Sequence, residues 1–148
     1  MDNTNLIKNE KGTTLVETAI IIMLLLIFIF GIIEFGLMLF NKQVLTNASR
    51  EGARAGIVVG LGRSGGNSAQ YLSVSKNTAS GFCADHLVTF GSSDLNVSAS
   101  YNDQDGSGSP SRGDILTVSL TYNYDFLVLS AFGIGPIPLN AVSAMKLE

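Results

Sequence analysis

The longest apolar run of the chain lies near its N-terminus. No charged residue occurs between Thr18 and Ile33, and the apolar character continues past Glu34 to Phe40. A bilayer core is about 30 Å thick, and a helix needs roughly 20 apolar residues to cross it. The many β-branched residues are no obstacle, because a helix in lipid satisfies its own backbone hydrogen bonds. The pattern predicts a membrane-spanning helix over residues 13–40.

The same helix is predicted to continue beyond the membrane as an amphipathic extension over residues 41–59. From residue 40 onward, apolar and small residues recur at steps of three or four, which is typical of one helix face. Glycines at 60, 62, 65 and 66 then end the helix, so we expect one helix of about 45 residues. The apolar face comprises Phe40, Val44, Ala48, Gly52, Ala55 and Val59, and the polar faces comprise Asn41, Lys42, Asn47, Arg50 and Arg54.

A row of small residues runs along this extension at four-residue spacing. Ala48, Gly52 and Gly56 allow another backbone to approach closely. The row can pack against the protein's own sheet, which is the simpler interpretation, or it can form a helix contact between subunits.

The second half of the chain alternates between apolar and polar residues. Three segments show this period of two, namely Leu95–Tyr101, Ile115–Phe126 and, less cleanly, Leu139–Leu147. Such alternation is typical of antiparallel strands with one buried face. The clearest apolar face comprises Leu116, Val118, Leu120, Tyr122, Tyr124 and Phe126. We expect this face to lie on the amphipathic half of the long helix, since nothing else is long enough to cover it. The fold class is therefore α+β, with residues 60–148 as the globular part.

Three shorter segments have weaker patterns. Ser68–Ser80 is interpreted as a short surface helix and Leu87–Phe90 as a short strand. Gly133–Pro138 alternates glycine and proline with isoleucine and predicts a rigid turn before the last strand.

Composition narrows the functional classes. The chain has 148 residues, a net charge of −3 and few charged residues, so it shows no footprint for nucleic acid. Cys83 is the only cysteine, which excludes an internal disulfide and favours a buried thiol over a bridge between chains. Cys83 and His86 are too few ligands for a metal site, and we expect no Cys–His catalysis unless a partner supplies further groups. No phosphate-binding loop and no nucleophile elbow occur, so we expect no enzyme and no cofactor.

The start of the apolar run carries an unusual combination. Gly12 precedes Thr13, and a carboxylate, Glu17, stands inside the beginning of the run. A charge at such a depth is costly and commonly marks function. The arrangement resembles the processing motif of type IV pilins, which a prepilin peptidase cleaves after the glycine. The resemblance implies that residues 1–12 are a leader with no fold of its own and that the mature chain begins at Thr13.

Two further blocks resemble the TadE-like family of the tight-adherence (Tad, or Flp) pilus system. They are Phe30–Gly36, which contains Glu34, and Leu45–Arg54. The recognisable residues of the second block are Asn47, Arg50, Glu51, Gly52 and Arg54. The resemblance covers residues 12 to about 57.

This resemblance implies a minor pilin or pseudopilin with a pilin-like α+β fold, supporting pilus biogenesis, surface adherence and biofilm. The implied partners are the prepilin peptidase, other pilins, the inner-membrane assembly platform and membrane lipid. It also implies a single-pass protein of the inner membrane, with the N-terminus in the cytoplasm and the C-terminal domain outside, which can enter an extracellular pilus. The alternative is a membrane-anchored binding module that is never assembled into a pilus.

Two carboxylates of the apolar helix are candidates for a role in assembly. Glu17 suits the positive end of the helix dipole, or, by the pilin resemblance, pairs with the freed amine of Thr13. Glu34 lies roughly 25 Å further along the helix, near the far side of the bilayer. It is either an interfacial carboxylate or a contact with a partner subunit, and the sequence does not separate these.

A polar loop echoes the calcium-loop template. Asp103, Asp105, Ser107 and Asp114 stand at template positions 1, 3, 5 and 12, with a glycine at position 6. However, no helices flank the loop, and Pro110 interrupts it. A polar hairpin loop between two strands explains the segment more simply, so no metal is expected.

Overall fold

Two helices and one antiparallel sheet make up the described part of the chain. The structure, a computed structural model, describes residues 4–61, 68–89, 94–107 and 110–148. In chain order the elements are α1 (Thr4–Leu61), α2 (Ser68–His86), β1 (Leu95–Asn102), β2 (Ile115–Tyr124), the 3₁₀ helix η1 (Leu129–Phe132) and β3 (Ile137–Lys146). The predicted α+β class is confirmed.

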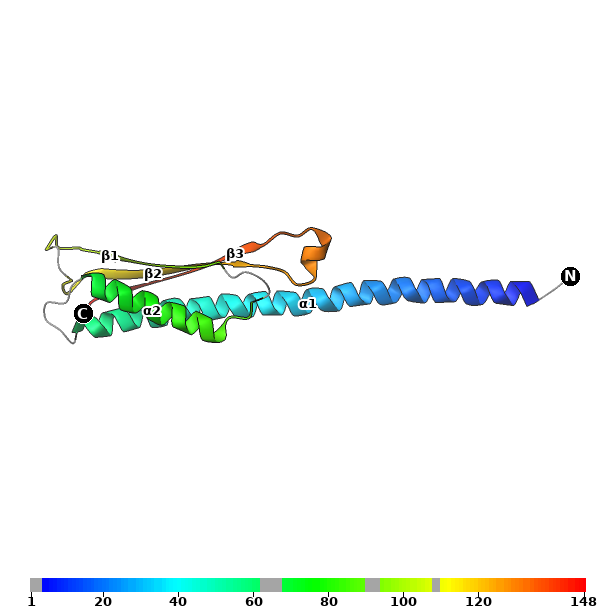
Figure 1. Ribbon diagram of the computed structural model, residues 1–148, viewed down its shortest axis with the longest axis horizontal. Coiled ribbons are helices and arrows are strands. Elements are labelled where there is room, and N and C mark those ends of the chain that lie inside the picture. The colour runs from blue at the N-terminus through cyan, green and yellow to red at the C-terminus, as the bar shows by residue number, and fades with distance from the viewer. Residues whose placement is uncertain (1–3, 62–67, 90–93, 108–109) are drawn as a thin grey trace.

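Helix α1 runs the length of the molecule and has two unlike halves (Figure 1). Its C-terminal half lies along the sheet and beside α2, whereas its N-terminal half projects alone. The helix begins at Thr4, so residues 4–12 of the predicted leader continue α1, and their removal by cleavage stays a prediction. It ends at Leu61, immediately after Gly60, and the other helix-ending glycines lie outside the described residues.

The sheet has the order β1-β2-β3 with antiparallel neighbours, so β2 is its central strand. Val97 of β1, Leu120 of β2 and Ala141 of β3 stand side by side in the register. The apolar face predicted for β2 is buried at every position, which confirms the strand and its orientation. The observed strands differ from the predicted ones by one to two residues at most ends.

Both helices cover the apolar face of the sheet, which corrects the expectation that α1 alone would do so. Helix α1 contacts β2 and β3, and α2 contacts β1. Segment 68–80 is therefore not a short surface helix. It belongs to a 19-residue helix whose inward stripe recurs every four residues at Tyr71, Ser75, Ala79 and Cys83. Ser75 and Ala79 are small, so α2 can pack closely against α1.

The predicted strand at Leu87–Phe90 is wrong for residues 87–89, which are irregular, and residue 90 lies outside the description. The Leu87 N–H extends the end of α2 by donating to the Cys83 carbonyl (N···O 2.9 Å).

The predicted turn before the last strand is present over residues 133–136, with η1 directly ahead of it, but its last two residues, Ile137 and Pro138, belong to β3. Gly133 has a φ of 80°, a left-handed conformation that glycine adopts without strain. Pro138 is tolerated inside β3 because β3 is an edge strand.

Candidate functional site

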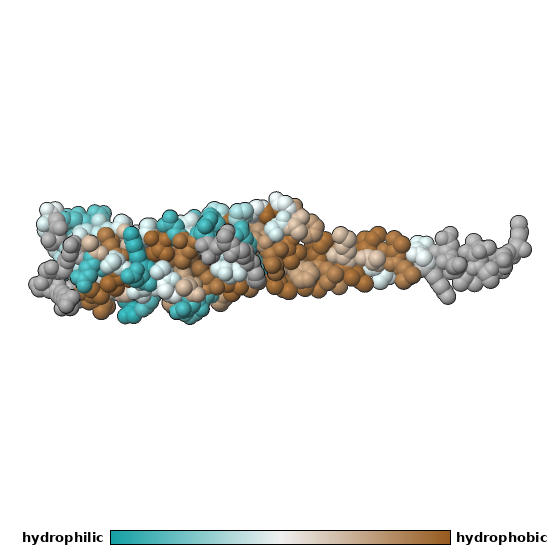
Figure 2. Space-filling view, viewed as in Figure 1, coloured by the Kyte–Doolittle hydropathy of each residue, from teal (hydrophilic) through white to brown (hydrophobic). Residues whose placement is uncertain are grey.

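The free half of α1 is an exposed apolar surface. The large apolar side chains from Leu15 to Ile33 are exposed, and Figure 2 shows the brown surface continuing along this half. Among the described residues, Gly12–Val59 is the one stretch long and apolar enough to cross a membrane. At about 1.5 Å per residue, residues 13–33 extend for roughly 30 Å, the thickness of a bilayer core.

The predicted processing residues lie at the N-terminal end of this surface. Gly12, Thr13 and Glu17 are exposed on a continuous helix. A Cβ added to Gly12 would meet no other atom within 4 Å. The position is therefore open, and Glu17 can be reached by a neighbouring chain.

Glu34 marks the junction between the free half of α1 and the sheet domain. It is only 2% exposed, and its carboxylate accepts the backbone N–H groups of Val128 (3.0 Å) and Leu129 (3.1 Å). The Tyr124 hydroxyl donates to the Glu34 carbonyl (3.5 Å). Neither sequence interpretation of Glu34 foresaw this role. Its carboxylate caps η1, which has no side-chain cap of its own, from a position 94 residues away.

The row of small residues on α1 faces the interior of the molecule. Ala48, Gly52 and Gly56 are buried. A Cβ on Gly52 would lie 2.8 Å from the Ser75 carbonyl oxygen and 2.9 Å from Ala79 Cβ. Of the two interpretations, the structure supports packing within the chain, because α2 and β2 occupy the space that a neighbouring helix would need.

The polar part of the TadE-like block points away from the sheet. Asn47, Arg50 and Arg54 are exposed, whereas Gly52 between them is buried. Arg54 donates Nη2–H and Nε–H to the Glu51 carboxylate, at 2.5 and 3.0 Å. The guanidinium of Arg54 lowers the pKa of Glu51, which stays ionised. The block thus has an inner face for packing and an outer face of mixed charge.

Asn41 is a structural residue that the sequence pattern misplaced. The helical pattern predicts a place for it on a polar face, but it is fully buried. Its Nδ2–H donates to the Val88 carbonyl (2.7 Å), and its Oδ1 accepts the Val88 N–H (3.0 Å). This pair ties the segment after α2 to α1. Only the asparagine's place beside the buried face, one turn before Val44 and Leu45, could have indicated it.

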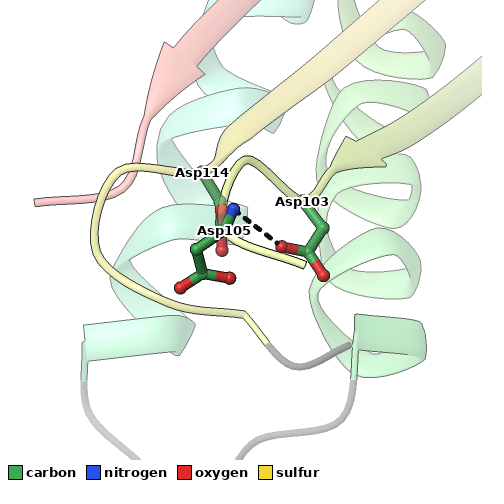
Figure 3. Close-up of side chains that lie close together, drawn as sticks. All are labelled: Asp103, Asp105 and Asp114. Atoms are coloured by element: carbon green, nitrogen blue, oxygen red, sulfur yellow. Dashed lines mark hydrogen bonds between the residues drawn. The ribbon is translucent and has the colours of Figure 1, made fainter. Parts of the chain in front are cut away.

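The acidic loop between β1 and β2 is organised by hydrogen bonds within the loop. One carboxylate oxygen each from Asp103, Asp105 and Asp114 lies within 4.8 Å of the others. Figure 3 shows the three side chains close together. Asp103 accepts the Asp105 N–H (3.2 Å), drawn as the dashed line in Figure 3, and the Gly106 N–H (2.8 Å). The Asp105 carboxylate accepts the Ser111 hydroxyl (2.6 Å) and the Ser107 N–H (2.9 Å).

Asp114 is the buried centre of this loop. It accepts the Tyr101 hydroxyl, the Gln104 N–H (2.8 Å) and the Ser111 N–H (2.6 Å). These donors, the Tyr101 hydroxyl foremost, lower the pKa of Asp114. The three carboxylates serve as acceptors that close a hairpin loop, which agrees with the simpler interpretation of the segment.

Cys83 and His86 lie on α2 and point to different surroundings. Cys83 is buried in the core, where burial raises the pKa of its thiol to about 11. His86 is exposed, and its ring stacks on Phe82 with centroids 4.4 Å apart. The expectation of a buried thiol is confirmed.

Comparison with known proteins gives a match for one region of the chain. No curated protein and no solved structure gives a significant match. Residues 12–54 match a family described as TadE-like protein. The matched residues begin at the predicted cleavage glycine, include the exposed apolar surface and Glu34, and end at Arg54. The resemblance to TadE-like proteins is therefore confirmed for this N-terminal region of the chain, residues 12–54.

Proposed function

We propose that this protein is a minor pilin or pseudopilin of a tight-adherence pilus, cleaved by a prepilin peptidase and lifted from the inner membrane during assembly. The observation that carries the proposal is the coincidence of the TadE-like match with the free half of α1. That half buries almost nothing within the chain, so its apolar side chains need lipid or other helices around them.

Assembly exchanges one apolar environment for another. Lipid tails are as apolar as leucine, so helices associate in a membrane through packing and polar contacts. Cleavage after Gly12 frees the amine of Thr13, and Glu17 lies one helical turn further on. An ammonium and a carboxylate attract each other several times more strongly in a low dielectric than in water. A pair between Thr13 of one subunit and Glu17 of the next would set their register.

The sheet domain would remain folded throughout this exchange. Its core is closed by α1, α2 and the sheet of the same chain. The outer face of the TadE-like block, with Asn47, Arg50 and Arg54, stays available to other components of the pilus or its assembly platform.

The processing step is tested by the mass of the N-terminus of the protein isolated from its own cells. We expect the mature chain to begin at Thr13. Gly12→Val serves as the control that changes the residue before the cleavage point. The site is open, so the larger side chain leaves the fold intact. A native protein that still begins at Met1 contradicts the proposal and favours the alternative, a membrane-anchored binding module outside any pilus.

The assembly step is tested by Glu17→Ala. We expect normal cleavage but no incorporation into sheared pili, measured by immunoblotting, because the Thr13 amine loses its partner in low dielectric. Glu17→Gln, which keeps the size but removes the charge, is expected to behave in the same way. Normal piliation with either variant contradicts the pairing.

A further inference from the structure

A long uncharged segment begins just after Asp125 in the loop between β2 and β3 and continues through most of β3. No charged residue occurs from Phe126 to Met145. Several of its large side chains near η1 are exposed to solvent. Leu127 is 59% and Phe132 58% exposed, and Ile134 and Ile137 are exposed as well. A contiguous apolar surface of this kind on a soluble domain marks a site of interaction.

This loop lies at the end of the sheet that faces the free half of α1 (Figure 1). The Glu34 carboxylate holds it there through the N–H groups of Val128 and Leu129. On α1 the apolar side chains just beyond Glu34 are exposed too. We call the combined surface the apolar collar, and it comprises Phe35, Leu39, Phe40, Leu127, Phe132, Ile134 and Ile137.

The collar continues the exposed surface of the apolar helix without a charged residue between them, since Glu34 is enclosed. Figure 2 shows the brown surface passing from the helix onto the shoulder of the sheet domain. Asp103, Asp105 and Arg112, around the loop between β1 and β2, and Lys146 lie at the opposite end of the sheet, whereas Asp94 and Asp125 lie at the collar end, before β1 and after β2.

The backbone of the collar loop is suited to an apolar environment. An unsatisfied N–H group in lipid costs several kcal/mol, by order of magnitude. Here Glu34 accepts the N–H groups of Val128, just before η1, and of Leu129, its first residue. The N–H groups of Ala131, Gly133 and Ile134 donate to carbonyls within the loop, at 3.1, 3.0 and 3.3 Å. Prolines at 136 and 138 carry no N–H.

We propose that the apolar collar rests in the headgroup–acyl boundary of the bilayer that α1 spans, as a second membrane contact that fixes the tilt of the sheet domain. This inference rests on the membrane anchoring that the proposed function requires. Lipid is the occupant that the observations favour, because the collar continues the lipid-facing surface. Apolar elements of this kind sink about 5–10 Å into the boundary. The collar would leave lipid together with the helix on assembly.

The chain contains no tryptophan, so single substitutions give unambiguous reporters. Phe132→Trp reports on the collar. Val142→Trp is the matched control, because Val142 is 66% exposed but lies on β3 away from the collar loop. Phe28→Trp, within the apolar helix, reports on the membrane anchor. Each full-length variant is reconstituted at low protein-to-lipid ratio in vesicles of phosphatidylcholine, with or without bromine on the acyl chains.

We expect brominated lipid to quench Phe132→Trp and Phe28→Trp strongly and Val142→Trp weakly, with a blue-shifted emission at position 132. If Phe28→Trp is quenched but Phe132→Trp behaves like Val142→Trp, the collar is overturned while the anchor stands. If none is quenched, both the anchor and the collar are overturned.

A blue shift at position 132 without quenching by brominated lipid indicates burial against a second copy of the chain and also overturns the lipid contact. If circular dichroism shows that Phe132→Trp fails to fold, Leu127→Trp replaces it, and the lipid contact of the collar is judged by the same criteria.

Discussion

At the scale of single residues, the tertiary structure depends on a few buried polar side chains. Glu34, Asn41 and Asp114 each satisfy backbone groups of a segment that has no secondary-structure partner for them. A buried donor or acceptor that loses its partner costs about 1–3 kcal/mol, more than an average hydrogen bond contributes. These residues therefore fix the positions of the connecting segments, whereas the apolar core packs the helices and strands together.

Asn41→Ala is expected to destabilise the sheet domain by about 1–3 kcal/mol, because it leaves the N–H and C=O of Val88 without partners. The measurement is urea unfolding of the full chain in detergent micelles, followed by circular dichroism. Gln43→Ala, on the exposed face of the same turn, is the control and should change little. Equal midpoints for the two variants would contradict the role of Asn41.

The lowered pKa of Asp114 predicts that the folded protein loses stability in acid. Its folded pKa lies below the ordinary carboxyl value because the Tyr101 hydroxyl and backbone N–H groups stabilise the carboxylate. A depressed folded pKa contributes stability above the unfolded pKa of about 4 and loses it as the pH falls through the folded value. We expect the melting temperature to fall below about pH 4.

The comparison variant is Asp114→Asn, which should melt at a lower temperature at neutral pH and show a shallower dependence below about pH 4. Asp94→Asn, at an exposed carboxylate before β1, should follow the unmodified protein. If Asp114→Asn keeps the full acid dependence, another group is responsible.

At the scale of elements, the packing of α2 against α1 depends on glycine. A Cβ at Gly56 would overlap the Ser75 hydroxyl and the Leu116 side chain. Glycine is a poor helix former, at about 1 kcal/mol relative to alanine, so its presence here reflects contact and not helix propensity. Gly81 of α2 differs, because a Cβ added there would meet no other atom within 4 Å, so no close contact requires a glycine at this position.

Gly56→Ala is expected to destabilise the domain by about 1–3 kcal/mol, because overpacking outweighs the gain in helix propensity. Gly81→Ala is expected to be neutral or to stabilise by up to about 1 kcal/mol. Urea midpoints of the two variants, measured side by side, test this. Stabilisation by both substitutions would show that α2 moves away from α1 without cost.

At the scale of the whole molecule, one helix belongs to two environments. Its C-terminal half completes the core of a domain, and its N-terminal half has no partner among the described residues of the chain. The sheet domain is therefore a folded unit carried on a free apolar helix, with Glu34 at the boundary between them.

Cys83 reports on opening of this domain, because it lies in the core cluster with residues of α1 and the sheet. Burial raises its pKa to about 11, so at pH 8 the thiolate fraction is about one in a thousand. We expect iodoacetamide at pH 8 to leave the native protein unmodified and to label it fully in urea. Rapid labelling of the native protein, or a disulfide-linked dimer on a non-reducing gel, would contradict the buried thiol.

The regular elements could be predicted closely from the pattern of residues. The strands around Val97, Leu120 and Ala141 follow a period of two, and the buried face of β2 was assigned at every position. The candidate site was recognised in part, since Glu34 and the TadE-like block were both singled out. The errors occurred where polar and small residues pack. The pattern of segment 68–80 predicts a surface helix because Ser75 and Ala79 carry little apolar area, although they form a close helix contact.

The sequence by itself determined the membrane-length helix, the alternating strands and the TadE-like region, because periodicity and short motifs are local properties of the chain. Only the tertiary structure decided that Glu34 caps η1, that Asn41 is buried and that the apolar loop lies beside the helix at its boundary. These contacts join residues between 47 and 95 positions apart. Hydrogen-bond partners at such separations leave no periodic trace, because each exists only once the core has brought the two segments together.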